Sequence, residues 1–566
     1  MKLIFKCNTL TVVGKGNIFF EIKWERFHKR GGMKMIRGQD VWDVDLLKDM
    51  SVKTISGKEL FTFNDLDRNY YEVLNKTTKK YPEKTAFVDN WGKEYSYEEF
   101  TSMVDDFSQY LTDCGMGKKK HVGMLLDNSI EFCVVFYSIC KIGAVAVPFP
   151  SKYRKQEVES LVKKSDLDHI VMADRFKEWN LFDSDKTTVS YDDENGYGFR
   201  HLEMKKGVRG NSKGDLDDEA VLMFTSGTTS ESKGVVMKNY NIIHATKVYE
   251  RLCGITEEDS TIIPVPIYHV TGLIALLGVF ICAGGTIYLN KRYEAKRILE
   301  TVRDNNITFM HGSPTVFNIM LDEKFEDLPS LRMILCGSSY LPVEKLGQLH
   351  KWLKTSEIRT VFGMTETASP GTLFPKDTAT SEYQSSSGKP VPGLELKVVD
   401  ENDKELGANK VGSVYIRGTN VVEYYYKTIS PLFHEGGWLD TGDMGYFNEE
   451  GYVFFVDRKK DMINRGGEKI WCTDLEDNLI KIEGIDDAAV VGIPSEKYGE
   501  VAAAVVKRTK GSNITEEDIK SILKSRIARF KIPEKILFID KIPKTKGLKT
   551  DKNYIRQLFK KEDEDA

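Results

Sequence analysis

A run of hydroxyl residues and glycine, closed by one lysine, lies between two apolar stretches at residues 224–234. Gly227 lets the backbone approach an anion closely, neighbouring hydroxyls and N–H groups donate to phosphate oxygens, and Lys233 supplies a positive charge. The β-branched pair Val235-Val236 soon follows, where a Walker A loop would continue into a helix. The run therefore predicts a strand–loop–strand phosphate site, although an ordinary polar surface loop has the same composition.

Four further segments follow this run in order. They are Pro266–Gly272, Val361–Thr367, Gly437–Asp443 and Asp457–Asp461. Together with the first run they resemble the motifs of the adenylate-forming superfamily, which contains acyl- and aryl-CoA synthetases, peptide-synthetase adenylation domains and luciferases. The chain resembles the AMP-forming acyl-CoA synthetases most. The resemblance extends from about Thr62 to about Lys560.

The resemblance implies an enzyme that activates a carboxylic acid with ATP. The carboxylate attacks the α-phosphate, pyrophosphate leaves, and the acyl-adenylate passes its acyl group to coenzyme A. Such an enzyme must hold the phosphates, neutralise developing charge and fix the ribose. The implied ligands of the β- and γ-phosphates are Thr225, Ser226, Gly227, Thr228, Thr229 and Lys233. Ser230 and Ser232 stand where usual members carry Gly and Pro, which alters loop flexibility more than charge.

The third segment resembles the metal- and adenine-binding motif. Glu366 matches the glutamate that coordinates Mg²⁺, a metal that prefers hard oxygen ligands, and Thr365 matches its phosphate-contacting neighbour. Phe362 and Gly363 stand where the family stacks an aromatic ring on adenine. The residues that line the other side of the base are, by resemblance, Gly337, Ser338 and Ser339. The structural alternative for Thr365-Glu366 is the start of a surface helix.

The last two segments resemble the ribose site and the hinge. Asp443 matches the acid that accepts hydrogen bonds from both ribose hydroxyls, and Arg458 matches its partner. Asp457 matches the hinge about which a small domain rotates between two half-reactions. After rotation, the implied channel for the pantetheine thiol includes Gly466, Gly467 and Glu468. Ordinary turns are the structural alternatives for Asp443 and for the glycine pair.

His269 is ambiguous on chemistry alone, because a histidine between apolar neighbours is typical of a satisfied core residue. In the family this position borders the acyl pocket and gates it, so we favour a substrate-positioning role. Small residues follow it at helical spacing, Gly272, Ala275 and Gly278. They either leave a channel for an alkyl chain or allow close helix packing.

The family's closing motif carries a lysine that stabilises charge during adenylation and then withdraws on the mobile domain. Lys549 has the family's distance from Pro543, but it follows Leu548, and Gly547 lies one place earlier. We assign the role to Lys549 over Lys546. An exposed basic turn is the alternative.

Alternating strands and helices must position these residues. Strands are expected at 122–126, 144–147, 220–224, 286–289, 307–311, 332–336 and 359–362, and helices at 130–142, 292–305, 314–322 and 342–352. Repeated units of this kind predict an α/β fold, with mainly parallel sheets covered by helices. Short strands at 394–399, 412–417 and 451–456 predict a β-rich subdomain. A small α+β unit follows, with a helix at 473–482, strands at 488–492 and 501–506, and a helix after Thr515.

The 566 residues are too many for one ordinary core. We expect an N-terminal extension at 1–60, a large adenylate-forming domain at 61–456 and a small mobile domain at 457–566. Met33 and Met35 follow Arg30-Gly31-Gly32, whose codons can be purine-rich like a ribosome-binding site. We therefore hypothesise that translation starts there, which would make part of the extension non-native.

Net charge, cysteine spacing and the longest uncharged run bear on binding partners and cellular location. The net charge of −4 provides no basic field for nucleic acid. The eight cysteines form no C-x-x-C pair and mostly lie in apolar surroundings, which predicts buried free thiols in a reducing cytoplasm. The uncharged run at 272–289 is long enough to span a membrane, but Gly284-Gly285 interrupts it. We expect a buried helix of about a dozen residues followed by a strand.

The leading interpretation is an AMP-forming carboxylate–CoA ligase that uses ATP, Mg²⁺ and coenzyme A on a fatty or other apolar acid. One alternative is a ligase that loads a separate carrier protein. Another is a degenerate nucleotide-binding protein without turnover, which Ser230, Ser232 and the shifted Gly547 would allow. Chain length and aryl or alkyl preference are not readable from the sequence.

Overall fold

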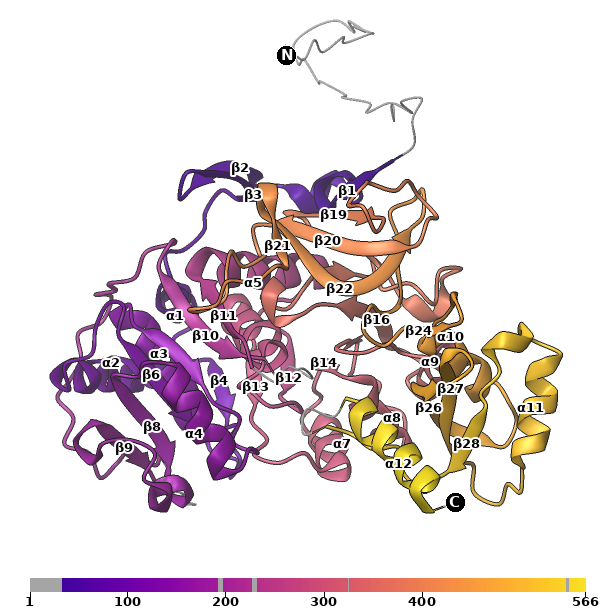
Figure 1. Ribbon diagram of the computed structural model, residues 1–566. Coiled ribbons are helices and arrows are strands. Elements are labelled where there is room, and N and C mark those ends of the chain that lie inside the picture. Colours follow the sequence, from indigo (N-terminus) through magenta and orange to yellow (C-terminus); the bar gives the residue numbers. More distant parts are fainter. Residues whose placement is uncertain (1–32, 192–196, 226–231, 324, 546–548, 566) are drawn as a thin grey trace, which may run out of the picture.

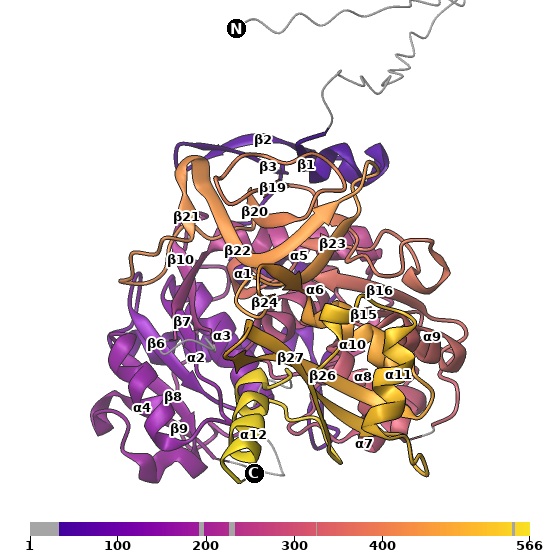
Figure 2. The same cartoon turned by 45° about the vertical axis from the view of Figure 1, so that its right-hand side comes forward.

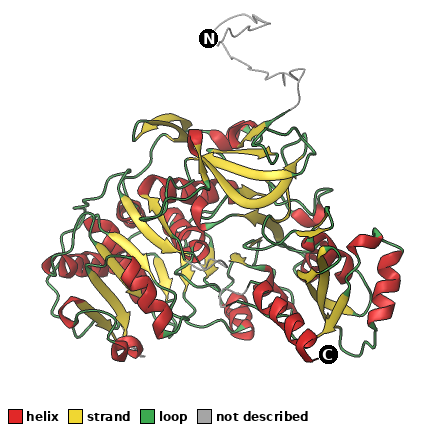
Figure 3. Cartoon of the chain, in the orientation of Figure 1, coloured by secondary structure: helices red, strands yellow, loops and turns green. Residues whose placement is uncertain are grey.

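A computed structural model describes residues 33–191, 197–225, 232–323, 325–545 and 549–565. The expected α/β fold is confirmed, with a large N-terminal region of mainly parallel sheets and helices and a smaller C-terminal region (Figures 1 and 3). Apolar residues between 463 and 559 form clusters apart from the main core. The smaller region therefore has its own hydrophobic interior.

The longest sheet in the described chain has nine strands. In spatial order they are β18 (Lys389–Pro390), β17 (Thr372–Leu373), β16 (Glu357–Phe362), β15 (Met333–Cys336), β14 (Phe309–Gly312), β12 (Ser260–Ile262), β13 (Thr286–Tyr288), β4 (Thr85–Val88) and β5 (Glu94–Ser96). The strands from β16 to β4 are parallel, and those at both edges are antiparallel. The carboxyl ends of β14, β15 and β16 consequently meet at one edge of the sheet.

A second sheet carries the two strands that flank the expected phosphate loop. Its order is β11 (Gly234–Lys238), β10 (Glu219–Phe224), β7 (Val145–Pro148), β6 (His121–Leu125), β8 (His169–Ala173) and β9 (Thr187–Ser190). Only β11 runs antiparallel to its neighbour, and the others are parallel. The predicted strand–loop–strand arrangement around Thr225 and Lys233 is therefore present.

The β-rich sheet and the C-terminal sheet follow. The first contains β1 (Met35–Arg37), β19 (Leu394–Val399), β20 (Gly412–Gly418), β22 (Trp438–Phe447) and β21 (Phe433–His434), with β23 (Val453–Arg458) also on β22. The second contains β25 (Glu468–Ile470), β24 (Ile463–Arg465), β27 (Gly499–Arg508) and β26 (Ile485–Ser495), with β28 (Lys535–Phe538) also on β27. The expected domain limit at Asp457 lies inside β23, one residue before that strand ends.

Helices pack on these sheets and on one another. The main ones are α1 (Tyr70–Lys80), α2 (Tyr97–Asp113), α3 (Ile130–Ile142), α4 (Lys155–Lys164), α5 (Asn239–Cys253), α6 (Val279–Ala283), α7 (Ala295–Asp304), α8 (Pro314–Asp322), α9 (Val343–Trp352), α10 (Cys472–Ile480), α11 (Glu516–Lys524) and α12 (Lys552–Asp565). Figures 1 and 2 both place α12 apart from α11, at the side of the C-terminal sheet near β26 and β27. The expected helix after residue 271 begins as a π-helix, η5 (Thr271–Gly278), and continues as α6.

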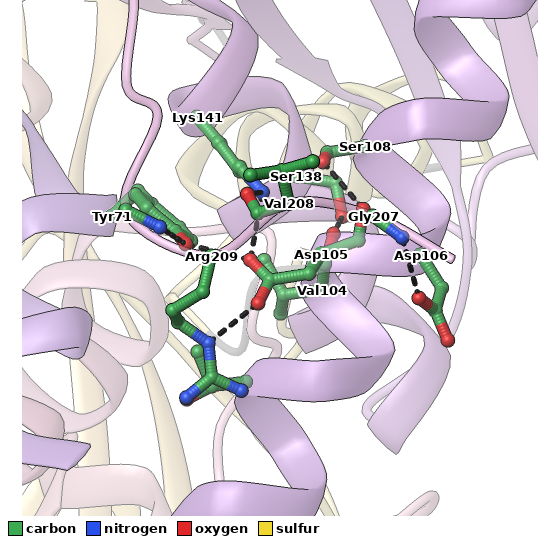
Figure 4. A network of polar contacts seen from close by, with 12 residues as sticks. Tyr71, Val104, Asp105, Asp106, Ser108, Ser138, Lys141, Gly207, Val208 and Arg209 are labelled. Carbon is green, nitrogen blue, oxygen red and sulfur yellow. Dashed lines mark hydrogen bonds and ion pairs between the residues drawn. The ribbon is translucent and has the colours of Figure 1, made fainter. Parts of the chain in front are cut away.

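A buried ion network ties three helices to the segment that precedes β10 (Figure 4). Asp105 of α2 accepts hydrogen bonds from Lys141 of α3 at 2.7 Å and from the Tyr71 hydroxyl of α1 at 2.6 Å. Arg209 donates to the second carboxylate oxygen of Asp105 at 2.6 Å. The side chains of Lys141 and Asp105 are only 5% and 4% exposed. Each charge therefore depends on its partners, because an unpaired ion is costly in this setting.

The N-terminal segment outside the matched motifs joins the fold from Met35. Strand β1 pairs antiparallel with β19, and Ile36 is buried. The backbone at Gly38 lies so close to Val391 that a Cβ atom would reach 1.8 Å from its carbonyl oxygen. Strands β2 (Met50–Ile55) and β3 (Lys58–Phe63) then form a hairpin. The extension thus contributes one edge of the β-rich sheet.

The apolar run after residue 272 is accounted for by η5, α6 and β13, which are mostly buried in the core. Over the described ranges, no helix has the length and apolarity needed to cross a bilayer. The cysteines within the described ranges are free thiols. Five of them are buried, and Cys114 and Cys282 are half-buried.

Candidate active site

The loop that we expect to bind phosphate begins and ends on paired strands. Phe224 of β10 lies opposite Gly234 of β11, and the Thr225 N–H donates to the Lys233 carbonyl at 3.0 Å. Ser226, Gly227, Thr228 and Thr229 lie outside the described residues. Thr225 and Lys233, at the two ends of the loop, are therefore held side by side by the strand register.

Glu366 is fixed by a residue that the sequence analysis did not select. It lies in a short 3-10 helix, Thr365–Thr367, which begins three residues after the end of β16, and is 7% exposed. The Tyr425 hydroxyl donates to Glu366 Oε1 at 2.8 Å, and the Lys233 ammonium lies over the Tyr425 ring, 4.9 Å from its centroid. Burial and the Glu366 charge raise the pKa of Tyr425, so its hydroxyl stays a donor. Glu366 and Lys233 therefore meet the same side chain, Tyr425.

The geometry of Glu366 fits a magnesium ion that takes most of its ligands from phosphate and water. No described residue forms a hydrogen bond to the second carboxylate oxygen, Oε2. The described ranges also contain no group of three or more His, Cys, Asp and Glu side chains placed to hold a metal. Thr365 is half-buried beside Glu366. A single carboxylate fits this mode of binding, because a phosphate-bound Mg²⁺ usually takes one or two carboxylates from the protein.

The expected adenine-binding segments lie at the carboxyl ends of neighbouring parallel strands. Gly337 and Ser338 follow β15, and Phe362 and Gly363 end and follow β16. The Phe362 ring stacks on Phe455, with centroids 3.8 Å apart and planes 23° from parallel. One face of the Phe362 ring is thus covered by a residue that the sequence analysis did not select.

Gly363 is a position where the backbone itself requires glycine. A Cβ atom there would lie 1.5 Å from the Ser369 carbonyl oxygen. Ser369 and Ala368 both adopt positive φ, at 96° and 49°. The turn after Glu366 is therefore tightly folded against the end of β16, and backbone strain of this kind is common at functional sites.

Asp443 and Arg458 are brought together by the pairing of β22 with β23. They are direct register partners, and Arg458 Nε lies 3.2 Å from Asp443 Oδ1. Asp443 is 7% exposed. Burial raises the pKa of its carboxyl group to about 6, against the opposing positive charges of Arg458 and Lys549. The pair predicted from the sequence is present, with the carboxylate inside and the guanidinium at the surface.

Lys549 brings its charge to several of these groups. It is exposed to solvent, yet the surrounding protein displaces enough water to lower its pKa, and Arg458 lowers that pKa further. The negative charges of Asp443 and Glu366 act in the opposite direction. Lys549 in turn lowers the pKa of His269. Lys546 lies outside the described residues.

His269 is half-buried and uncharged at neutral pH. Burial lowers its pKa to about 4, and the positive charges of Lys549 and Lys152 add to this effect. The segment that leads to His269 is held by Asn128. Its side-chain amide donates to the Val265 carbonyl and accepts from the Ile267 N–H, both at 2.8 Å. Lys152 and Asn128 escaped the sequence analysis because they lie more than a hundred residues earlier.

The small residues after His269 are packed tightly. A Cβ atom at Gly272 would lie 2.6 Å from Ile267 Cα, and one at Gly278 would lie 2.5 Å from the Tyr70 hydroxyl oxygen. Ala275 is buried. The small residues therefore allow close packing at both glycines, and they do not leave a channel for an alkyl chain along this face.

Asp457 contacts the first turn of α10. Its carboxylate accepts hydrogen bonds from the Cys472 N–H at 2.6 Å and from the Arg458 N–H at 2.8 Å. Burial raises its pKa, and the Lys552 charge opposes that shift. The side chain thus joins the end of β23 to the beginning of the C-terminal region.

Gly466 and Gly467 form an exposed turn between β24 and β25, and Glu468, also exposed, begins β25. Both glycines have positive φ, at 58° and 96°, and the Gly466 N–H donates to the Tyr498 carbonyl at 2.8 Å. No hydrogen bond or ion pair of the described chain joins this turn to Glu366 or Asp443. The charges of those two acids act on Lys549, whereas the hydrogen bonds of the glycine turn are made with Tyr498 and Asn464.

Two family models match most of the chain. The model described as AMP-binding enzyme matches residues 74–426, and the one described as AMP-binding enzyme C-terminal domain matches residues 474–549.

Named relatives match over nearly their whole length. Oxalate–CoA ligase of Arabidopsis thaliana is 30% identical over 510 residues, covering 86% of this chain and 98% of the relative. A 2-succinylbenzoate–CoA ligase of Listeria monocytogenes is 28% identical, with the same coverage.

Solved structures share the fold. ATP-bound MatB from Rhodopseudomonas palustris superposes with a TM-score of 0.81 at 24% identity, covering 87% of this chain and 99% of that one. O-succinylbenzoate coenzyme A synthetase from Bacillus subtilis, in complex with ATP and magnesium, gives a TM-score of 0.76 at 24% identity, covering 86% and 99%.

Proposed function

Because this chain belongs to the AMP-binding enzyme family, we propose that it joins a carboxylic acid to coenzyme A with ATP as the energy source. It is an enzyme of the AMP-forming carboxylate–CoA ligase type. The products of the proposed reaction are an acyl-CoA thioester, AMP and pyrophosphate. The relatives named above are CoA ligases and match over 98% of their length, which supports this activity.

The observation that carries the proposal is the convergence of Lys549 on groups far from it in sequence. Its charge acts on Asp443, Glu366 and His269 together. In the first half-reaction a carboxylate oxygen bonds to the α-phosphorus, and the bond from that phosphorus to the pyrophosphate oxygen breaks. Negative charge accumulates on the α-phosphate, and a lysine aimed there stabilises it. Asp443 and Arg458 hold the ribose.

The phosphate end of ATP lies, in this proposal, between Lys233 and Glu366. Lys233, Thr225 and the undescribed loop residues bind the β- and γ-phosphates, and Thr365 contacts the phosphate beside them. Glu366 holds Mg²⁺, which when bound neutralises phosphate charge and orients the pyrophosphate leaving group. Phe362, Gly363, Gly337 and Ser338 surround the adenine.

The second half-reaction requires a different placement of the C-terminal region. We assign residues 61–456 and 457–566 to two domains that rotate about Asp457. The Asp457–Cys472 hydrogen bond belongs to the arrangement described here, in which Lys549 lies near Asp443. Rotation removes Lys549 and brings Gly466, Gly467 and Glu468 toward the thiol channel.

The acid substrate binds beside His269 in this proposal. A fatty or otherwise apolar acid was expected from the sequence, and His269 borders the position assigned to it. The names of the relatives include oxalate and succinylbenzoate, so a diacid or aryl acid belongs in any test. A separate carrier protein is the alternative acceptor. The free thiols support a location in the cytoplasm.

Half-reactions measured on Lys549→Ala test the mechanism. ATP, Mg²⁺, CoA and a panel of short, medium, long-chain, dicarboxylic and aryl acids first identify the acid by mass spectrometry of AMP and acyl-CoA. Lys549→Ala should then reduce acid-dependent pyrophosphate release by about 10²- to 10³-fold. CoA transfer from supplied acyl-adenylate should persist.

Lys541→Ala, an exposed lysine of the same segment, is the matched control and should change neither step. Unchanged pyrophosphate release in Lys549→Ala would refute the assignment. ATP binding without any acid-dependent product would favour the degenerate interpretation, and pyrophosphate without thioester would favour a carrier protein.

A further inference from the structure

Tyr425 contacts two charged groups that come from opposite ends of the proposed phosphate site. Its hydroxyl donates to Glu366 Oε1 at 2.8 Å, and its ring lies beneath the Lys233 ammonium at 4.9 Å. Glu366 and Lys233 are 133 positions apart in the chain. Tyr425 is 3% exposed, so both contacts lie out of bulk water. A hydrogen bond from a hydroxyl to a carboxylate is stronger than one between neutral groups.

The backbone around Tyr425 is attached to the same two elements. Tyr425 forms a bridge with Val235 of β11, two residues after Lys233, and the Tyr426 N–H donates to the Gly234 carbonyl at 2.7 Å. Val422 N–H donates to the Glu366 carbonyl at 2.9 Å. The segment therefore joins the end of the phosphate loop to the Glu366 turn through its main chain.

The ring itself is held in place. It packs against Phe433 of β21 with centroids 5.2 Å apart and planes 63° from parallel. A buried tyrosine with a fixed ring has little freedom to move its hydroxyl away from Glu366. Since the hydroxyl occupies Oε1, the carboxylate is oriented with Oε2 as the oxygen left for a metal.

We propose that Tyr425 is a positioning residue that sets the orientation of Glu366 for Mg²⁺ and the position of Lys233 for the phosphates of ATP. This inference rests on the function proposed above. Partners that orient a metal-binding carboxylate typically change metal affinity 10- to 100-fold when they are removed. The ring contact is a separate contribution, because a cation over an aromatic face is stabilised without any hydrogen bond.

Two variants separate the hydroxyl from the ring. Tyr425→Phe keeps the ring and removes the hydroxyl, so it should raise the Kd of Mn²⁺, measured by electron paramagnetic resonance with α,β-methylene-ATP present, by about 10- to 100-fold. Tyr425→Leu also removes the ring, so it should weaken binding of the same analogue in EDTA about 2- to 5-fold relative to Tyr425→Phe. Neither readout depends on turnover.

The chain offers a matched control in the adjacent tyrosine. Tyr424 is 37% exposed and its hydroxyl donates to Glu219, away from Glu366. Tyr424→Phe should leave both Kd values unchanged. Thermal unfolding of all variants tests whether each is folded.

Glu366→Gln distinguishes failure of this inference from failure of the proposed function. If Glu366→Gln weakens Mn²⁺ binding while Tyr425→Phe stays within about twofold of the wild type, well below the change expected for an orienting partner, the inference is wrong. If Glu366→Gln has no effect either, the metal role of Glu366 is wrong and the inference falls with it. Weakening in both single variants, with less than additive loss in the double variant, supports the coupling.

Discussion

Replacing Asp443 by Asn should stabilise the protein and weaken nucleotide binding at the same time. Asp443 is buried, and its pKa is raised from the ordinary 3.8 to about 6. The folded state therefore binds this proton more tightly than the unfolded state does. At 1.36 kcal/mol per pKa unit, this difference lowers the free energy of unfolding by about 3 kcal/mol when the carboxylate is ionised in the folded state.

The sign of the pH dependence follows from the raised pKa. The cost is fully present above about pH 6 and disappears as the pH falls to 3.8, so ionisation of Asp443 makes the wild type less stable at pH 8 than at pH 4. Asp443→Asn removes the charge but keeps the shape. It should raise the free energy of unfolding by about 3 kcal/mol at pH 8 and by much less near pH 4. Arg458 loses a partner at little cost, because its side chain is 53% exposed.

Urea unfolding of both proteins at several pH values between 4 and 8 measures this difference, and the comparison cancels the other titrating groups. ATP binding should weaken about 10- to 100-fold in Asp443→Asn, because the amide offers one neutral acceptor oxygen where the carboxylate offers two charged ones. Parallel stability curves for the two proteins would refute the electrostatic reasoning. Unchanged ATP affinity would refute the ribose assignment.

Two further predictions concern packing. Asp105→Ala should lower the free energy of unfolding, measured by urea denaturation, by about 3 to 5 kcal/mol, because it leaves Lys141 buried without its carboxylate; a loss below 1 kcal/mol, the range of exposed pairs, would contradict this. Gly278→Ala should lower the melting temperature, because the added Cβ atom would meet the Tyr70 hydroxyl at 2.5 Å. An open channel at Gly278 would instead accept the methyl group without loss.

Elements with clear end signals were predictable to the residue. Helices α3 and α8 begin and end where the sequence placed them. Ser129 and Ser313 cap their first turns, and Gly143 ends α3 in a left-handed conformation. The helix expected at 292–305 is shorter, Ala295–Asp304. Pro342, expected in the first helical turn, instead lies just before α9. Ends without a distinctive cap shift by a few residues because tertiary packing decides them.

The π-helical turn was not predictable, because every residue from 272 to 278 is apolar and no period marks a change in hydrogen bonding. The site was predictable where residue types are specific, as for Asp443 with Arg458. Tyr425 was missed because it lies in a run of three tyrosines. Tyr424 is exposed and Tyr425 is buried, but three identical residues show no such alternation in the sequence. Only tertiary contacts show which of the three reaches Glu366.

The π-helix at Thr271–Gly278 also determines how this stretch tolerates changes in length. Its i→i+5 bonds accommodate a wider turn than the α-helix that follows it, so the segment holds surplus chain. Deleting one residue there lets the backbone return to α-helical bonding while β13 keeps its place. An inserted residue would have to widen the helix further, and the close contacts of Gly272 and Gly278 with their neighbours oppose this. Libraries that reshape the neighbourhood of His269 should therefore favour single deletions over insertions at this turn.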